Sequence, residues 1–485
     1  MKKQITLSLA LLASLSSANA GGYLTNTNQH IAFLRNPARN ASTSIDALYS
    51  NPAGAAFLPE GWHLSLNLQS AYQKRNILST LPSYAANADG KSKSGERLFE
   101  GNAAAPIIPS LFAAYKVGKW TFGLNTAVIG GGGRGKFEGG LPTFEAPISL
   151  VPSLLTSAKF PANQYQYETY IEGKQYVFGL TLGAAYRINE NFSVYAGLRG
   201  AYANNSYSGY ARNIQANIGG QMQSVPGYLQ AAAAQASAAA AQATQAGNAA
   251  MATQYTAAAT MATRYAAMTA DKSLDLDQSG FGIAPIIGVN YKLGDLHLAA
   301  KYEFRTAIQV TNKANTPNTT GIADYNDDVK VDNDIPALLS LGAQYSILEN
   351  LRVSAGYHHY FDKQAKMASG KQALLQGNTN EYLLGVEYDL NTKLTLSAGG
   401  QITAYGQSDA FQSDLSFHND SFSIGLGLAY KLNDKVKLNA AYFFTDYQDY
   451  SKTAPAVAQL NPTLMSTNVY KRTNQVFGLG MDLSL

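Results

Sequence analysis

The segment from Phe281 to Phe304 reads FGIAPIIGVNYKLGDLHLAAKYEF, and apolar side chains recur at every second position on both sides of Gly294-Asp295. Successive side chains of a β-strand point to opposite faces, so alternation around a short Gly-Asp turn predicts a β-hairpin. On its second strand one face is apolar and the other carries charge. The apolar face holds Leu296, Leu298, Ala300, Tyr302 and Phe304, and the polar face holds His297, Lys301, Glu303 and Arg305.

Five further segments show the same alternation around a very short polar turn: Leu111 to Leu124, Tyr176 to Leu198, Ala337 to Tyr357, Tyr382 to Ala404 and Phe422 to Phe444. Two unpaired alternating segments, Trp62 to Tyr72 and Phe477 to Leu485, bring the predicted total to fourteen strands. Each hairpin carries a tyrosine on its apolar face near the short turn, which is typical of an aromatic girdle at a membrane interface. These tyrosines are Tyr115, Tyr186, Tyr291, Tyr345, Tyr388 and Tyr430.

The connections between the predicted strands alternate in length. Six are tight turns, and the others are loops at about residues 74–105, 130–174, 204–280, 309–334, 362–380, 405–420 and 448–473. An even strand number, an apolar outer face and short turns on one side are typical of closed barrels in outer membranes. The sequence therefore predicts an all-β fold, a 14-stranded antiparallel transmembrane β-barrel with its long loops outside the cell. A soluble β-sandwich is the alternative, but it would place charges on its outer face.

The composition restricts the chemistry that the protein can perform. The 485 residues include no Cys, which excludes disulfides and thiolate metal sites, and 46% of them are hydrophobic. Without Lys2 and Lys3 the chain has 34 basic and 32 acidic side chains, so nothing favours binding to nucleic acid. We find no nucleophile elbow, phosphate-binding loop or calcium-binding loop. We therefore expect neither an enzyme nor a bound metal or cofactor.

The N-terminus has the features of an exported protein. Lys2 and Lys3 precede the apolar stretch Ile5 to Leu15, and Ala18-Asn19-Ala20 is a pattern that signal peptidase accepts. We predict a signal peptide over residues 1–20, a mature chain beginning at Gly21 and a location in a Gram-negative outer membrane. Residues 21–60 do not alternate. Because a barrel of fourteen strands has room inside, we predict that they form a plug, or hatch, within a barrel of residues 61–485.

Within this predicted plug, Asp46 to Phe57 reads DALYSNPAGAAF and resembles the Asn-Pro-Ala signature of the FadL-type transporters, which admit long-chain fatty acids and other hydrophobic compounds. The resemblance assigns Asn51, Pro52 and Ala53 to the plug, either as a turn that folds it or as part of a gate. It also implies passive uptake, a lumenal pocket near Gly21 and sideways exit through a gap beside the third strand. That strand corresponds to Trp120 to Ile129, followed by Gly130 to Gly133, and a flexible entry to the next loop is the plainer interpretation.

The third outer loop, residues 204–280, is rich in alanine and has no charged side chain between Arg212 and Arg264. Alanine favours helix and Gly247-Asn248 interrupts it, so we predict two helices. One face of the second helix carries a stripe of large side chains. We expect this stripe either to pack on the partner helix or the barrel rim, or to collect apolar ligand with its adaptable methionines. The stripe contains Met251, Tyr255, Met261, Tyr265 and Met268.

A fatty acid carries one carboxylate and a long alkyl chain, so its site needs apolar walls and a cation. The strand alternation predicts which basic side chains point into the lumen. These candidates for binding the carboxylate are Arg199, Lys301, Arg305, Arg352 and His358. The alternative is that Glu303, Glu387 and Asp389 pair with these cations and hold the plug.

The favoured function is passive uptake of long-chain fatty acids or other hydrophobic compounds. A surface-binding or adhesion barrel and a general porin are the alternatives. We expect a monomer whose partners are outer-membrane lipid and hydrophobic small molecules.

Overall fold

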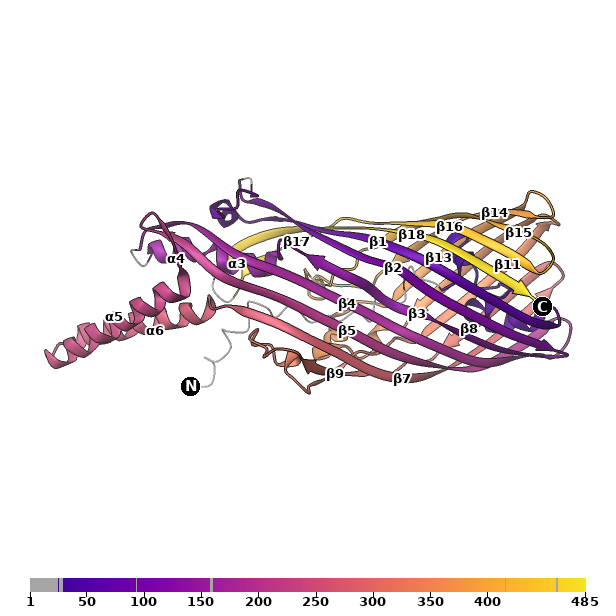
Figure 1. Cartoon of the computed structure of the whole chain (residues 1–485), viewed down its shortest axis with the longest axis horizontal. Coiled ribbons are helices and arrows are strands. Elements are labelled where there is room, and N and C mark those ends of the chain that lie inside the picture. The colour runs from indigo at the N-terminus through magenta and orange to yellow at the C-terminus, as the bar shows by residue number, and fades with distance from the viewer. Residues whose placement is uncertain (1–24, 26–28, 93, 158–159, 415, 459–460) are drawn as a thin grey trace.

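The computed structural model of the chain describes residues 25, 29–92, 94–157, 160–414, 416–458 and 461–485 (Figure 1). The predicted signal peptide, residues 1–20, and Gly21 lie outside them. Within this part, fourteen strands form a closed antiparallel barrel, in which β18 pairs with both β16 and β1. They are β1 (Gly61–Thr80), β2 (Glu96–Val117), β3 (Trp120–Phe137), β4 (Ala162–Arg187), β5 (Phe192–Ile218), β7 (Lys272–Leu293), β8 (Leu296–Glu303), β11 (Leu338–Leu348), β12 (Leu351–Tyr360), β13 (Thr379–Asp389), β14 (Leu394–Ala404), β15 (Ser421–Lys431), β16 (Val436–Tyr447) and β18 (Asn461–Ser484).

The two faces of the wall have the predicted character. On β8, Leu298 is exposed on the outer face, whereas Lys301 and Glu303 are buried in the lumen. Five of the six girdle tyrosines are exposed on the outside, and Tyr186 is half-buried because its ring lies 4.6 Å from that of Trp120. An apolar exterior around a polar, filled interior places the protein in a Gram-negative outer membrane and confirms the predicted fold. No helix in the described residues is long and apolar enough to cross a membrane.

The strands extend further outward than the sequence pattern predicts. β1 continues to Thr80 and β2 begins at Glu96, so the first outer loop is shorter than residues 74–105. The same is true of β4, β5 and β7. Beyond the membrane the outer face of a strand no longer meets lipid, while inner-face residues such as Ile77 and Phe99 still pack in a buried core. The backbone ladder therefore continues where the apolar alternation has ended. Four short strands extend the sheet at this end: β6 (Gln221–Ser224), β9 (Gln309–Ala314), β10 (Lys330–Asp332) and β17 (Tyr450–Val457).

The N-terminal segment packs inside the barrel through α1 (Ile31–Arg35), α2 (Ala47–Ser50) and η2 (Pro52–Phe57). It contacts strand backbone where the wall has glycine instead of a side chain. A Cβ at Gly425 would lie 2.3 Å from the Leu34 carbonyl oxygen, and one at Gly342 would lie 2.5 Å from Asn40. Real Cβ atoms do not approach other atoms so closely, so any side chain at these wall positions would collide with the plug. The plug therefore fits the wall in one position.

Helices cover the outer end of the barrel. α3 (Pro142–Ser149) and α4 (Val151–Ser157) follow β3, and α5 (Val225–Gln245) and α6 (Ala249–Met268) follow β5. The predicted pair of helices is confirmed, with the Asn248 side chain accepting from the Met251 N–H at 3.1 Å at the start of α6. This hairpin projects away from the barrel (Figure 1). In the described parts of the other outer loops lie the short 3₁₀ helices η3 (Pro82–Ala86), η4 (Ala323–Tyr325), η5 (Asp362–Gln364) and η6 (Ala368–Leu374).

Candidate functional site: cavities beside a gap in the barrel wall

The hydrogen-bond ladder between β2 and β3 is interrupted. Pairing ends at Ala104↔Arg134 and resumes at Ser110↔Ala127. The β2 side of the interruption contains Pro106 and Pro109, which have no backbone N–H to donate. The backbone ladder is therefore interrupted between two neighbouring strands, and we call this interruption the wall gap.

The β3 side of the wall gap is shaped by glycines. Between Val128 and Gly133 the register with β4 shifts twice, so β3 bulges there. Gly131 and Gly133 have positive φ angles of 111° and 72°, which residues other than glycine rarely adopt. A Cβ at Gly131 would lie 2.3 Å from the Gln175 carbonyl oxygen. The glycine run therefore forms a bent strand, as the resemblance implies, and not a flexible loop entry.

A cavity lies on the lumen side of the wall gap, above the plug. Its empty space is about 1100 Å³, part of which is open to solvent, and we call it the lumenal cavity. Leu34 of the plug lies on one side of it and Ile108, Val128 and Gly130 of the gap on another. The cavity therefore lies between the plug and the wall gap.

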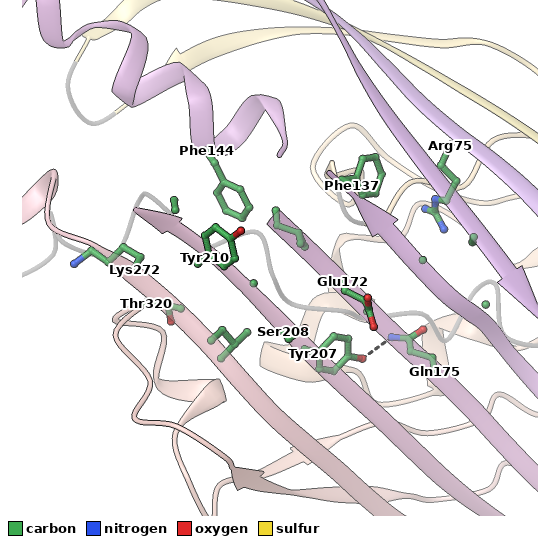
Figure 2. A pocket seen from close by; sticks show the side chains of 18 of the residues that line it. Arg75, Phe137, Phe144, Glu172, Gln175, Tyr207, Ser208, Tyr210, Lys272 and Thr320 are labelled. Atoms are coloured by element: carbon green, nitrogen blue, oxygen red, sulfur yellow. Dashed lines mark hydrogen bonds between the residues drawn. The ribbon is translucent and has the colours of Figure 1, made fainter. Parts of the chain in front are cut away.

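A second cavity of about 920 Å³, the outer cavity, adjoins the lumenal cavity (Figure 2). The two share Arg75, Ala103, Gly132, Gly133 and Gln175, so they lie side by side. The outer cavity is mainly apolar, and Gln175 donates to the Tyr207 hydroxyl at 2.5 Å on its wall. Its apolar lining comes from Phe137, Phe144, Ile171, Tyr207 and Leu274.

A third hollow, the loop groove, lies further out between α3, α4 and the base of the α5/α6 hairpin. Its lining is almost entirely apolar. Helix α3 separates it from the outer cavity, because Phe144 faces the outer cavity and Ile148 faces the loop groove. The loop groove is lined by Pro147, Ile148, Val151, Leu154, Leu155, Val225, Leu229, Tyr265, Met268 and Thr269.

A buried carboxylate holds α3 between the two hollows. Glu145 lies 2.7 Å from Nε of Arg97 and accepts hydrogen bonds from Asn87, Tyr165 and Tyr167 at 2.8, 2.7 and 3.0 Å. Burial raises the pKa of Glu145, although the Arg97 charge opposes that shift. Three segments of the outer end, namely β2, β4 and the end of η3, are therefore fixed to one helix.

Known proteins share this architecture. A family model described as an outer membrane protein β-barrel domain matches residues 318–468. A FadL homologue from Pseudomonas aeruginosa superposes with a TM-score of 0.60 at 14% identity, over 95% of this chain and 99% of that one. The Pseudomonas putida toluene transporter TodX gives 0.51 at 16% identity over 90% and 94%, and the CymD monoaromatic hydrocarbon channel gives 0.50 at 13% over 93% and 98%. No curated protein sequence matches the chain.

The chain has the FadL-type barrel fold. Within this FadL-type barrel, Asn51 of the plug signature is buried and donates to the Ser42 carbonyl oxygen at 3.0 Å and to Oδ1 of Asn290 on β7 at 2.8 Å. Pro52 begins η2, and the Ala53 carbonyl oxygen accepts from the Ser193 hydroxyl at 2.7 Å. The signature therefore attaches the plug to the wall.

The five predicted lumenal cations all lie beside carboxylates. Arg199 and Lys301 both pair with Glu303, and Lys301 also donates to the Tyr49 carbonyl oxygen of the plug at 2.8 Å. The remaining pairs are Arg305–Asp334 at 3.0 Å, Arg352–Asp389 at 2.6 Å and His358–Glu381 at 2.8 Å. None of the five lines the lumenal or outer cavity. Their contacts are those expected of residues that hold the plug and the outer loops, and their contact with ligand stays a prediction.

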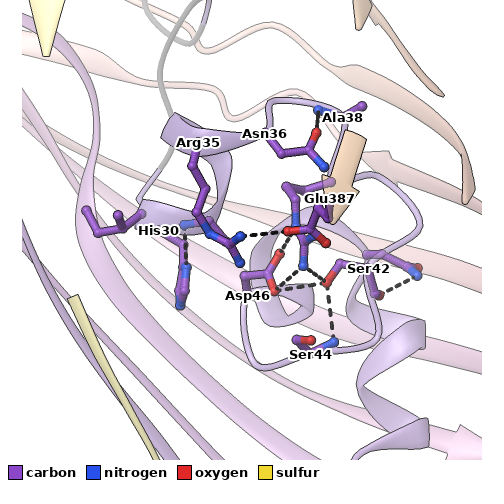
Figure 3. Close-up of polar contacts among 12 residues, drawn as sticks. His30, Arg35, Asn36, Ala38, Ser42, Ser44, Asp46 and Glu387 are labelled. Carbon is purple, nitrogen blue, oxygen red and sulfur yellow. Dashed lines mark hydrogen bonds and ion pairs between the residues drawn. The ribbon is translucent and has the colours of Figure 1, made fainter. Parts of the chain in front are cut away.

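The polar network of the plug continues through Glu387. This carboxylate accepts from Arg35 at 2.8 Å and from Arg39 at 3.0 Å, and Arg39 also binds Asp46 at 2.8 Å (Figure 3). All four groups are buried. Each charge therefore has a partner, which buried ions require.

The predicted stripe on α6 divides into two parts. Tyr265 and Met268, near its base, line the loop groove, whereas Met251 and Met261 are exposed. Tyr255 is half-buried. The seam between the two helices is made by small side chains that allow close approach: Ala233, Ala240, Ala243, Ala259 and Ala266.

Sequence reasoning missed Arg75, Arg472 and His418, which line the lumenal cavity. All three fall in segments that the alternation pattern assigned to loops. The position of the arginines in the strand alternation could have found them, because Arg75 and Arg472 lie on the inward face of continuous strands. The two residues are directly opposite each other between β1 and β18.

Proposed function

We propose that the protein is a passive outer-membrane transporter that takes up hydrophobic compounds, with long-chain fatty acids as the leading candidates. Ligand would collect in the loop groove, pass through the outer and lumenal cavities and leave sideways through the wall gap into the membrane. The observation that carries this proposal is the position of the lumenal cavity, which lies between a fitted plug and the interrupted ladder of the wall gap.

The plug supports sideways exit because it blocks the direct way down. Its backbone packs against wall glycines at positions where a side chain would collide. Its arginines also pair with Glu387 of the wall, so its removal would expose buried charges. The same packing disfavours a general porin, which needs a continuous aqueous lumen.

The lining supports hydrophobic cargo. Burying an alkyl chain contributes about 0.8 kcal/mol per methylene group, so a long chain supplies most of its own binding energy. By their titles, two proteins of this fold carry toluene or monoaromatic hydrocarbons and another is a FadL homologue. TodX is a transporter and CymD a channel by name, which supports a role in transport.

A reversible block of the wall gap tests the proposal. Because the chain has no Cys, an Ile107→Cys variant carries a single thiol at the gap, where the native side chain is 69% exposed. A bulky disulfide-forming reagent on that thiol should reduce uptake of a fluorescent fatty acid by cells, and a reducing agent should restore it. Leu384→Cys is the matched control, because Leu384 is 68% exposed on β13, away from the gap. Equal uptake by labelled and unlabelled Ile107→Cys protein would contradict sideways exit.

A further inference from the structure

Arg75 and Arg472 form a like-charged pair across two neighbouring strands. Their Cα atoms are register partners between β1 and β18, and both side chains are half-buried at the lumenal cavity. Directly opposed like charges destabilise a sheet. In the part of the chain that the structure describes, neither guanidinium forms an ion pair with a carboxylate, and no Asp or Glu lines this cavity.

Four other cations of the lumen show how unusual this pair is. Arg35, Arg39, Arg199 and Lys301 are buried in the same lumen, and each binds a carboxylate. The barrel thus neutralises cations where they hold the plug, but leaves two charges uncompensated where the cavity is open.

Both guanidinium groups are held in position by aromatic rings. Cζ of Arg75 lies 4.6 Å from the centre of the Phe417 ring, and Cζ of Arg472 lies 4.2 Å from that of Tyr447. Nη2 of Arg75 also donates to the Phe417 carbonyl oxygen at 3.4 Å, and the other N–H groups of a stacked guanidinium stay available for a second partner. Among the described residues, buried Nε of Arg472 and Nδ1 of His418 have no hydrogen-bond partner. Burial, together with the charges of Arg472, Arg75 and Lys371, lowers the pKa of His418 well below its usual value, so its ring is neutral at pH 7.

We propose that Arg75 and Arg472 bind the head group of an amphiphile that carries two negative charges, as an alkyl phosphate does, while its tail lies toward Ile108 and Val128 at the wall gap. This proposal rests on the proposed uptake function and names a substrate class for it. An alkyl phosphate carries nearly two charges at pH 7, and arginine binds phosphate with two parallel hydrogen bonds. One carboxylate would leave a net positive charge in the cavity, whereas a phosphate monoester neutralises both guanidinium groups.

Calorimetric titration of the full-length protein in a neutral detergent tests this substrate class. Dodecyl phosphate should bind at least tenfold more tightly than dodecanoate, and inorganic phosphate alone should bind weakly because it has no tail. In an Arg75→Gln/Arg472→Gln double variant, dodecyl phosphate should lose at least 30-fold in affinity, while a neutral probe such as dodecanol should bind as to wild type.

The neighbouring lysines provide the matched control. Lys74 and Lys471 adjoin the two arginines in sequence but are exposed, so Lys74→Gln/Lys471→Gln should leave all affinities unchanged. Equal affinity for dodecyl phosphate and dodecanoate, or unchanged phosphate binding in the arginine variant, would overturn the proposal. If the wild-type protein does not bind dodecanol, that result would instead count against the uptake function. The heat-dependent shift of the folded band on a denaturing gel checks that each variant is folded.

Discussion

The amide of Asn51 donates a 2.8 Å hydrogen bond to Oδ1 of Asn290, which joins the plug signature to the wall strand β7. Both side chains are buried, at 1% and 0% exposure. In Asn51→Ala the Asn290 carbonyl loses its donor inside the lumen, and such a loss costs about 1–3 kcal/mol. We expect the plug to be held less firmly, and planar-bilayer recordings should show more frequent ion-conducting openings than wild type.

Asn290→Ala is the partner variant in this test. If the hydrogen bond is the relevant interaction, Asn290→Ala should raise conductance similarly, and the double variant should add little to either single change. Additive effects of the two substitutions would show that Asn51 acts through other contacts, such as the one with Ser42.

The loop groove predicts a division of roles along α6. Met268 lines this groove, so Met268→Asn should lower fatty acid uptake several-fold at low concentrations, because it places an amide in an apolar collecting site. Met261 is 56% exposed, so Met261→Asn on the same helix should leave uptake unchanged. The measurement is initial uptake rate against fatty acid concentration. Normal uptake by both variants, together with loss of surface attachment when residues 231–268 are deleted, would favour the adhesion barrel.

A buried carboxyl group predicts a pH response in an outer loop. Burial raises the pKa of Asp362 in η5 to about 6, while Oδ2 accepts from the Thr379 N–H at 2.8 Å. The folded loop therefore favours the protonated form. Stability from this group is fully present below the ordinary aspartate pKa near 3.8 and is lost as the pH rises through about 6.

Hydrogen exchange measures this response. After correction for intrinsic exchange rates, amides of residues 362–378 should be better protected at pH 5 than at pH 7.5. Asp362→Asn keeps the acceptor oxygen but has no charge, so its protection should be independent of pH over this range. An Asp362→Asn variant with the same pH dependence as wild type would assign the response to another group.

Much of the barrel is predictable from sequence because lipid imposes a simple rule on each strand. Leu298 and Lys301 fall on opposite faces for that reason, and the same rule located all fourteen strands. The rule ends with the membrane. Arg75 lies on an outward extension of β1 where the outer face no longer needs apolar side chains, so the alternation that predicts a membrane strand is lost there.

The wall gap is harder to predict for a different reason. Pro106 and Pro109 of β2 and Gly130 to Gly133 of β3 are each weak signals, and only the pairing register brings them opposite each other. Arg75 and Arg472 present the same difficulty at greater range, since β1 meets β18 only when the barrel closes. Structural features that lie on one strand can be predicted from the sequence, whereas features formed by two strands depend on how the strands pair.

The salt bridges of Glu303 distinguish the two roles considered for the lumenal cations. Glu303 pairs with both Arg199 and Lys301, and all three side chains are buried. In Glu303→Gln both cations lose their counter-charge, and breaking a buried pair costs about 3–5 kcal/mol. If the pairs hold the plug, the variant should lose its folded gel band at a lower temperature while its affinity for dodecanoate is unchanged. If the cations bind ligand, freeing them should instead strengthen dodecanoate binding several-fold. Glu138→Gln is the control, because its pair with Lys136 is exposed and should contribute little to either measurement.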